Sequence, residues 1–182
     1  MTEIPDPGDR GVRRYSQRPL PAYRYVPGLH PHPTRDARGH SYEARLTLNR
    51  PVRWSADEWR TLDDWLYGVD LFNRFYFWEA HEAWEGLWAA TERDRAPSLL
   101  LQGLIQIAAA LLKTHMGVLA GARSLSEEGV AKLRRAAAMQ PRLLGVDIGY
   151  TAAGFGAYFA SLARNELPPI GPDVPVLRLR SG

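Results

Sequence analysis

The sequence predicts an all-α protein, a compact bundle of about five helices with an irregular N-terminal arm. Apolar residues recur with the helical period from about residue 55 to about residue 162. Helix start and stop signals divide this region into five segments, and no strand is needed to account for it. The first 50 residues are rich in Pro, Arg, Tyr and His and show no sustained period. We therefore expect an arm (1–50), a helical domain (51–167) and a C-terminal tail (168–182).

The first helix has the clearest start signal. Ser55 and Glu58 have the spacing of a capping box, in which each side chain accepts a hydrogen bond from the other residue's backbone N–H. The apolar positions that follow predict a helix to about Phe72. A second helix is expected over about residues 76–90.

Three further helices complete the predicted body. Residues 97–116 form a helix that is apolar nearly all round, as expected of a central buried helix, and Pro97 suits its first turn. The next helix covers about residues 118–138. The last begins near Asp147, a residue type favoured as an N-cap. The tail segment 174–179 is apolar enough to be extended.

Composition limits the kinds of site available. The chain has 182 residues, 45% of them hydrophobic, and no cysteine, so any metal site must use His, Asp, Glu or backbone oxygen. No signal peptide or membrane-spanning segment is evident, and we expect a soluble cytoplasmic protein with no membrane partner. The formal charge of +3 comes from the arm, where nine arginines and five acidic residues give +4. With no long basic stripe and no known reading motif, the sequence argues against nucleic-acid binding.

The arm is too apolar to be a free tail. Its tyrosines and leucines predict that its second half lies across the helical body, while about the first 20 residues are expected to be mobile. Three of the five histidines, His30, His32 and His40, fall in the arm. His30 and His32, each followed by proline, are interpreted as surface turn residues, with joint binding of an ion as the alternative. His32 or His40 could also contribute to a metal site formed by the body.

The most informative segment is residues 72–88, which sets ionisable groups in an aromatic helix. His81 and Glu85 are one helical turn apart and share the face of Phe77 and the neighbouring tryptophans. A buried carboxylate needs hydrogen-bond donors, a counter-charge or a metal. One interpretation is an internal polar cluster, in which Gln102 and Gln106 donate amide hydrogens to Glu85 and His81 shares a proton with it.

The second interpretation is a single divalent metal ion bound by His81 and Glu85. The pattern His81-Glu82-x-x-Glu85 is similar to that of zincins, where the first and fifth positions bind zinc and the second is the general base. Here the second histidine is replaced by Glu85, and Glu82 should point about 100° away, toward the polar side. Glu82 and Asp147 are the candidate bases, although Asp147 is better explained as a helix cap.

Several motifs resemble those of the family called domain of unknown function 309. They are Phe72-Asn73, Glu79-Ala80-His81-Glu82, Glu85, Trp88, Leu101-Gln102-Gly103-Leu104-Ile105-Gln106, Ala108-Ala109, Gly121-Ala122 and Gly145-Val146-Asp147. The resemblance covers about residues 58–164 and implies a compact all-helical fold with the first two helices as a hairpin. The chain departs from the pattern at Arg74-Phe75, where a glycine is expected in the hairpin turn.

Two function classes follow from these observations. The first is a small non-enzymatic binding or interaction protein, with an unknown protein or small molecule as partner and self-association as a further possibility. The second is a metal-dependent enzyme, of the hydrolase class, with His81 and Glu85 as ligands. The metal content of protein purified without a His tag separates the two.

Overall fold

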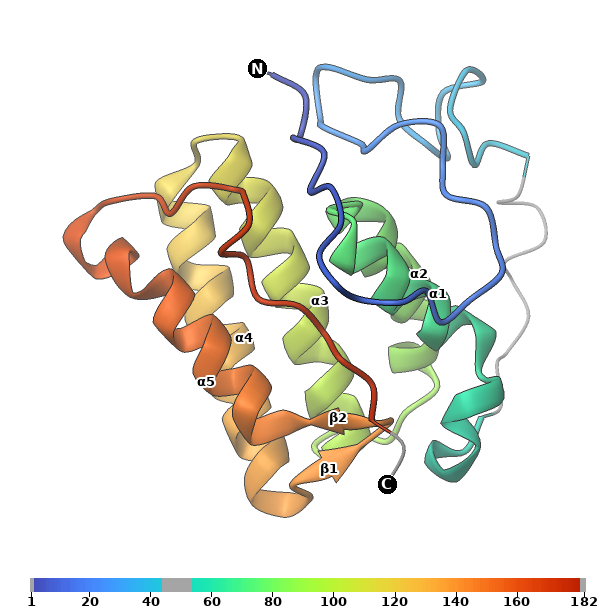
Figure 1. Cartoon of the computed structure of the whole chain (residues 1–182), viewed down its shortest axis with the longest axis vertical. Coiled ribbons are helices and arrows are strands. Elements are labelled where there is room, and N and C mark those ends of the chain that lie inside the picture. Colours follow the sequence, from blue (N-terminus) through green and yellow to red (C-terminus); the bar gives the residue numbers. More distant parts are fainter. Residues whose placement is uncertain (1, 44–53, 181–182) are drawn as a thin grey trace.

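The computed structural model describes residues 2–43 and 54–180 and confirms the all-α fold (Figure 1). Four helices lie close to their expected bounds: α2 (Phe77–Ala89), α3 (Ala96–His115), α4 (Leu119–Met139) and α5 (Ile148–Tyr158). A 3-10 helix, η3 (Phe159–Arg164), continues from α5. Asp147 is the N-cap of α5, because its side chain accepts a hydrogen bond from the backbone N–H of Tyr150 (3.0 Å).

The first predicted helix is broken in two. A 3-10 helix, η2 (Ala56–Thr61), precedes α1 (Asp63–Asn73), and Leu62 between them has non-helical backbone angles. The capping box is not formed, since Ser55 accepts from the backbone N–H of Asp57. The segment before the break makes contacts with residues far away in the sequence, which the local helical pattern cannot predict. The Trp54 indole N–H donates to the carbonyl of Leu87 (3.1 Å), at the far end of α2.

The hairpin of α1 and α2 is confirmed, and tryptophans hold it together. A Cβ atom at Gly68 would lie 2.1 Å from Nε1 of Trp84, so only glycine lets α1 approach this indole. The rings of Trp65 and Trp84 lie 5.8 Å apart, both fully buried. The turn contains Phe75, which has a positive φ of 64° where a glycine is expected.

Helix α3 is the central helix and lies between α2 and α4 (Figure 1). By length and apolar composition it could cross a membrane, but 72% of its apolar window is buried within the protein, as is common for a core helix. Its glycine permits a close helix crossing. A Cβ at Gly103 would lie 2.9 Å from the Leu133 side chain and 3.0 Å from the Gly129 carbonyl oxygen on α4.

A two-strand hairpin, which the sequence pattern does not predict, connects α4 to α5. Strands β1 (Arg142–Leu143) and β2 (Val146–Asp147) pair antiparallel. Leu144 and Gly145 between them both have positive φ, 52° and 77°, as a two-residue type I′ turn requires. The indole N–H of Trp65 donates to the Leu144 carbonyl (3.1 Å) and ties the turn to α1.

Both ends of the chain lie on the helical body (Figure 1). The arm packs from its beginning, not only over its second half, since Ile4 is buried and Tyr15 and Ser16 bond to α1. The tail forms no strand over the expected segment 174–179. It runs beside α3 to the hairpin, where the backbone N–H of Arg180 donates to the Gly145 carbonyl (2.9 Å). The part of the predicted arm and domain boundary over 44–53 lies outside the described residues.

Candidate functional site

The predicted internal cluster of His81, Glu85, Gln102 and Gln106 does not form. Glu85 lies at the surface with half of its side chain exposed, and its only ion-pair contact among the described residues is with Nε2 of His81 (3.3 Å). The buried face of α2 is centred on Phe77, Ala80, Trp84 and Leu87, whereas Trp78 and Trp88 are only partly buried. Since these two indoles widened the predicted apolar face, they shifted its centre toward positions 81 and 85.

Gln106 of α3 faces α4 instead of α2. The side-chain amide of Gln106 donates to Oε2 of Glu128 (2.7 Å), and Glu128 also pairs with Lys132 (3.6 Å). Gln102 is partly exposed. Gln106 therefore belongs to the α3–α4 contact, and the predicted ligand-binding role of the two glutamines with the exposed Glu85 loses its geometric basis.

The buried carboxylate of α2 belongs to Glu79, which the sequence analysis named only as part of a family motif. Its side chain is 5% exposed, and Oε1 accepts hydrogen bonds from the Tyr25 backbone N–H (2.9 Å) and from Nε2 of His40 (3.0 Å). Oε2 has no hydrogen-bond donor among the described residues. Glu79 thus binds two separate points of the arm.

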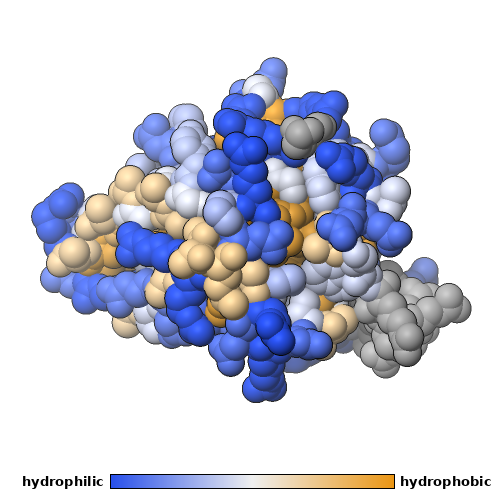
Figure 2. Space-filling model, turned by 90° about the horizontal axis from the view of Figure 1, so that it is seen from below, coloured by the Kyte–Doolittle hydropathy of each residue, from blue (hydrophilic) through white to orange (hydrophobic). Residues whose placement is uncertain are grey.

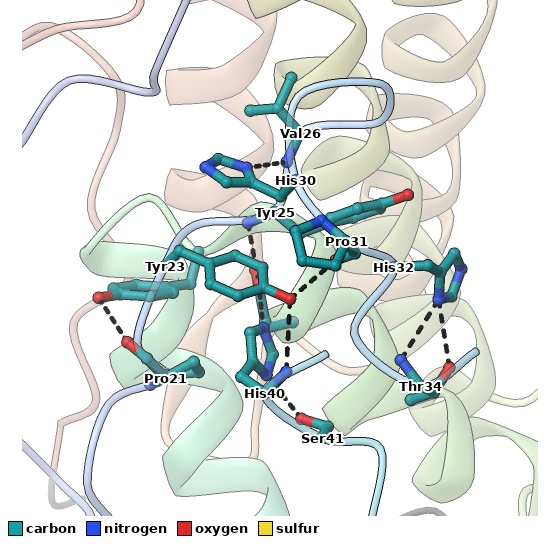
Figure 3. Close-up of polar contacts among 12 residues, drawn as sticks. Pro21, Tyr23, Tyr25, Val26, His30, Pro31, His32, Thr34, His40 and Ser41 are labelled. Atoms are coloured by element: carbon teal, nitrogen blue, oxygen red, sulfur yellow. Dashed lines mark hydrogen bonds and ion pairs between the residues drawn. The ribbon is translucent and has the colours of Figure 1, made fainter. Parts of the chain in front are cut away.

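Figure 3 shows the arm residues that gather around His40. Ser41 Oγ lies 2.7 Å from Nδ1 of His40, so both imidazole nitrogens of His40 are engaged. The Tyr23 hydroxyl donates to the Pro31 carbonyl (2.8 Å) and accepts from the His40 backbone N–H (3.3 Å). In this arrangement His40 is a partner of Glu79 and is not free to bind a metal.

Two buried polar residues of α1 hold the chain ends in the same way. Asp70 is fully buried and accepts from the backbone N–H groups of Tyr15 (2.9 Å) and Ser16 (2.8 Å) in the arm. Asn73 forms a reciprocal pair with Leu177 in the tail: its amide donates to the carbonyl, and its Oδ1 accepts from the N–H, both at 2.8 Å. The buried polar groups of the hairpin therefore satisfy the backbone of the arm and the tail.

The remaining arm histidines differ in availability. His30 accepts from the Val26 backbone N–H at Nδ1 and contacts Glu3 at Nε2 (2.9 Å), so both nitrogens are occupied. His32 accepts from the Thr34 N–H at Nδ1 (3.3 Å), and no hydrogen bond of its Nε2 occurs within the described part of the chain. Burial and the charge of Arg35 lower the pKa of His32, so its imidazole is neutral near pH 7.

One group of potential metal ligands remains at the surface of α2: His81, Glu82 and Glu85. Each residue offers one ligand atom, and the three atoms lie within 4.8 Å of one another. Glu82 therefore joins His81 and Glu85 and does not point away from them as the helical spacing suggested. His81 is partly buried, and both carboxylates are exposed.

The negative charges of Glu82 and Glu85 repel each other in this cluster. Glu82 is open to solvent at its surface, yet nearby protein atoms desolvate it, and this raises its pKa. The negative charge of Glu85 adds to the increase, and His81 and Arg35 oppose it. Among the described residues neither carboxylate has an Arg or Lys nitrogen within 4.0 Å. A cation at this position would relieve the repulsion.

The other sequence candidates have structural roles. Asp147, considered as a base, caps α5 from the hairpin, away from the helix that carries His81. His115 is the last residue of α3, and its Nε2 contacts the Thr2 carbonyl (2.8 Å). Sequence reasoning missed Asp70, Asn73 and Glu79 as polar anchors. The available signal was an acidic residue within the apolar run Val69–Phe72, together with the motif positions of Asn73 and Glu79.

The fold and these contacts define the class of protein: a small all-helical protein whose first helical hairpin holds its own arm and tail and presents a His/Glu cluster at its surface. Residues 65–125 match the model of the family described as "Domain of unknown function (DUF309)". This segment runs from α1 into α4, and the match confirms the resemblance over a shorter range than the motifs suggest. No curated protein matches the chain.

Proposed function

We propose that this protein binds a single divalent cation through His81, Glu82 and Glu85 on the exposed side of α2. The observation that carries the proposal is the convergence of one imidazole nitrogen and two carboxylate oxygens within 4.8 Å. Metal–ligand bonds of about 2.0–2.2 Å place pairs of ligand atoms about 3–4 Å apart, so small side-chain rotations suffice. The like charges of the two carboxylates, unneutralised by Arg or Lys in the described part, favour a cation between them.

The ligand types favour zinc or manganese. Imidazole suits Zn²⁺, and a set with two carboxylates also suits Mn²⁺. Three protein ligands on one exposed helix leave coordination positions for water or for an oxygen of a substrate. A metal held in this way would supply Lewis-acid chemistry, which supports the metal-dependent hydrolase class. Glu82 is then a ligand and not the general base of the zincin pattern.

His32 is the arm residue best placed to support this site. Its ring contacts Trp78 edge to face (5.4 Å between centroids), and Trp78 lies one helical turn before Glu82. Tyr25 packs on the same indole (5.3 Å), which holds this part of the arm on α2. Since His32 is neutral near pH 7 and its Nε2 has no hydrogen bond within the described residues, it is a candidate for a fourth ligand.

The test is the metal content and metal affinity of the untagged protein. We expect about one equivalent of Zn²⁺ or Mn²⁺ to bind to the wild type, and at least tenfold weaker binding to His81→Ala and to Glu85→Gln. Glu127→Gln is the matched control, because Glu127 is an exposed acidic residue on α4 with no ion pair among the described residues. It should bind as the wild type does.

Equal affinity in the wild type and in the double variant His81→Ala/Glu85→Gln would refute the metal site. The favoured class would then be the non-enzymatic interaction protein. Since both side chains lie at the surface, these substitutions should leave the thermal midpoint nearly unchanged, so loss of binding is not confused with unfolding.

A further inference from the structure

A second site is suggested by three arginines around the β-hairpin. A groove of about 510 Å³ lies between η2, the hairpin and the end of the tail. Arg60 of η2, Arg142 of β1 and Arg180 of the tail line it. This end of the molecule is seen in Figure 2, where strongly hydrophilic side chains lie beside small apolar patches. The groove shares no residue with the proposed metal site.

The charges of these arginines are not neutralised by direct pairs. Within residues 2–43 and 54–180, none of the three guanidinium groups has a carboxylate oxygen within 4.0 Å, whereas Arg18 and Arg38 each have one at 2.8 Å. Two acidic residues also line the groove, Asp57 and Asp147, which leaves a lining charge of +1 (three minus two). Oδ1 of Asp147 accepts the α5 cap bond from Tyr150.

The hairpin turn organises all three arginines. The Arg60 guanidinium lies over the Trp59 ring, 4.7 Å from the centroid. That indole packs against Gly145 so closely that a Cβ there would lie 2.7 Å from Trp59 Cη2. Arg180 donates its backbone N–H to the Gly145 carbonyl. The backbone of Arg142 lies opposite that of Asp147 in the register of the two strands. Segments far apart in the sequence thus bring three cations to one turn.

We propose that this groove binds the phosphate group of a small molecule. A tetrahedral phosphate presents oxygens in three directions, which suits guanidinium groups that approach from three chain segments, whereas a planar carboxylate presents only two. The groove volume lies within the usual range of about 300–1,000 Å³ for small-molecule sites. At pH 7 a phosphate monoester carries about −1.5 to −2 charges, which are opposite in sign to the +1 lining charge of the groove.

The test is a titration of the whole protein with glycerol 3-phosphate at low ionic strength, followed by NMR or calorimetry. We expect saturable binding, with acetate at least tenfold weaker. Arg60→Gln, Arg142→Gln and Arg180→Gln should each weaken binding by about tenfold, the usual effect of losing a charge-assisted hydrogen bond. Arg93→Gln is the control, since Arg93 is exposed in the α2–α3 connection and does not line the groove.

Three results would overturn the proposal. One is equal binding to the wild type and to the triple arginine variant. Another is equal affinity for acetate and glycerol 3-phosphate, which would assign the groove to carboxylates. The third is tight binding of a single-stranded oligonucleotide that glycerol 3-phosphate does not displace, which would make the arginines a nucleic-acid contact. Because all three side chains are exposed, unchanged melting of the variants separates loss of binding from loss of fold.

Discussion

Two glutamates on α2 differ sharply in burial. Glu79 is buried and holds the arm, whereas Glu85, six residues later, is half exposed. Each directly follows a tryptophan in the sequence. The sequence analysis expected a buried carboxylate on this helix but assigned it to Glu85. It could not identify which one, because Glu79 is buried by arm residues Tyr25 and His40, which are remote in the chain.

This difference in burial predicts that truncating the two side chains lowers the stability of the protein by different amounts. Glu79→Ala should lower the free energy of unfolding by about 1–3 kcal/mol, because the Tyr25 N–H and His40 lose their acceptor in a buried site. Glu85→Ala should change it by less than about 0.5 kcal/mol, as for other exposed positions. Urea denaturation of both variants provides the measurement. Similar midpoints for the two would contradict the assignment of Glu79 as the buried anchor.

Glu82 gives metal binding a defined pH dependence. The raised pKa means that Glu82 keeps its proton at a higher pH than the ordinary 4.5, and a ligand must lose its proton to bind metal. Metal affinity should therefore fall as the pH falls toward this range, by up to about tenfold per pH unit for each proton displaced. Calorimetric titrations at several pH values test this, and Glu82→Gln should flatten the profile. A pH-independent affinity in the wild type would exclude Glu82 as a ligand.

The sign of the same shift also constrains stability. A carboxyl whose pKa is raised by folding is disfavoured in its charged form, so its ionisation reduces stability as the pH rises past the unfolded value. Glu82→Gln should consequently not destabilise the metal-free protein at neutral pH. This separates a loss of metal binding in that variant from a loss of fold.

Among the elements, helices were predictable and their junctions were not. The helical period and the proline and cap signals place the ends of α2, α3 and α4 within about one residue of their observed bounds and identify Asp147 as the N-cap of α5. The break at Leu62 and the turn at Leu144-Gly145 depend on contacts between distant segments, such as that of Trp65 with the Leu144 carbonyl. Local sequence does not contain that information.

The turn between α1 and α2 allows two opposing effects to be compared. Phe75 has a left-handed conformation, which costs about 1–2 kcal/mol for a non-glycine residue. Its ring is fully buried and stacks on Phe77 (5.3 Å), and truncating a buried phenylalanine costs about 3–5 kcal/mol. Burial wins, so Phe75→Gly should destabilise the protein by roughly 1–4 kcal/mol. A thermal midpoint at or above that of the wild type would show that backbone strain dominates.

For the whole molecule, the arm and the tail are part of the folded structure. Asp70 and Glu79 bind the arm and Asn73 binds the tail, so the buried polar groups of the hairpin are satisfied only when both ends are in place. The tyrosines and leucines of the arm predicted that it covers the helical body. The sequence analysis did not predict that buried side chains bind the backbone of the arm and the tail. Every residue has a similar backbone, so the sequence does not mark which residues supply these hydrogen bonds.

Deletion of residues 1–50 should therefore expose both polar and aromatic surface. Asp70 and Glu79 would lose their backbone donors, and the apolar surface covered by Ile4 and Val26 would become accessible. We expect reduced stability and self-association, measured by light scattering and thermal unfolding. A deletion variant that stays monomeric with an unchanged midpoint would show that the arm is dispensable for the fold.

The central functional claim is that α2 carries a cation site, and anomalous X-ray scattering tests it most directly. Crystals soaked with Zn²⁺ should give an anomalous peak within about 2.0–2.2 Å of a His81 nitrogen and of carboxylate oxygens of Glu82 and Glu85. The same soak of His81→Ala/Glu85→Gln crystals should give none there. A wild-type structure with no peak at this cluster, or with the peak at other residues, would contradict the proposed site.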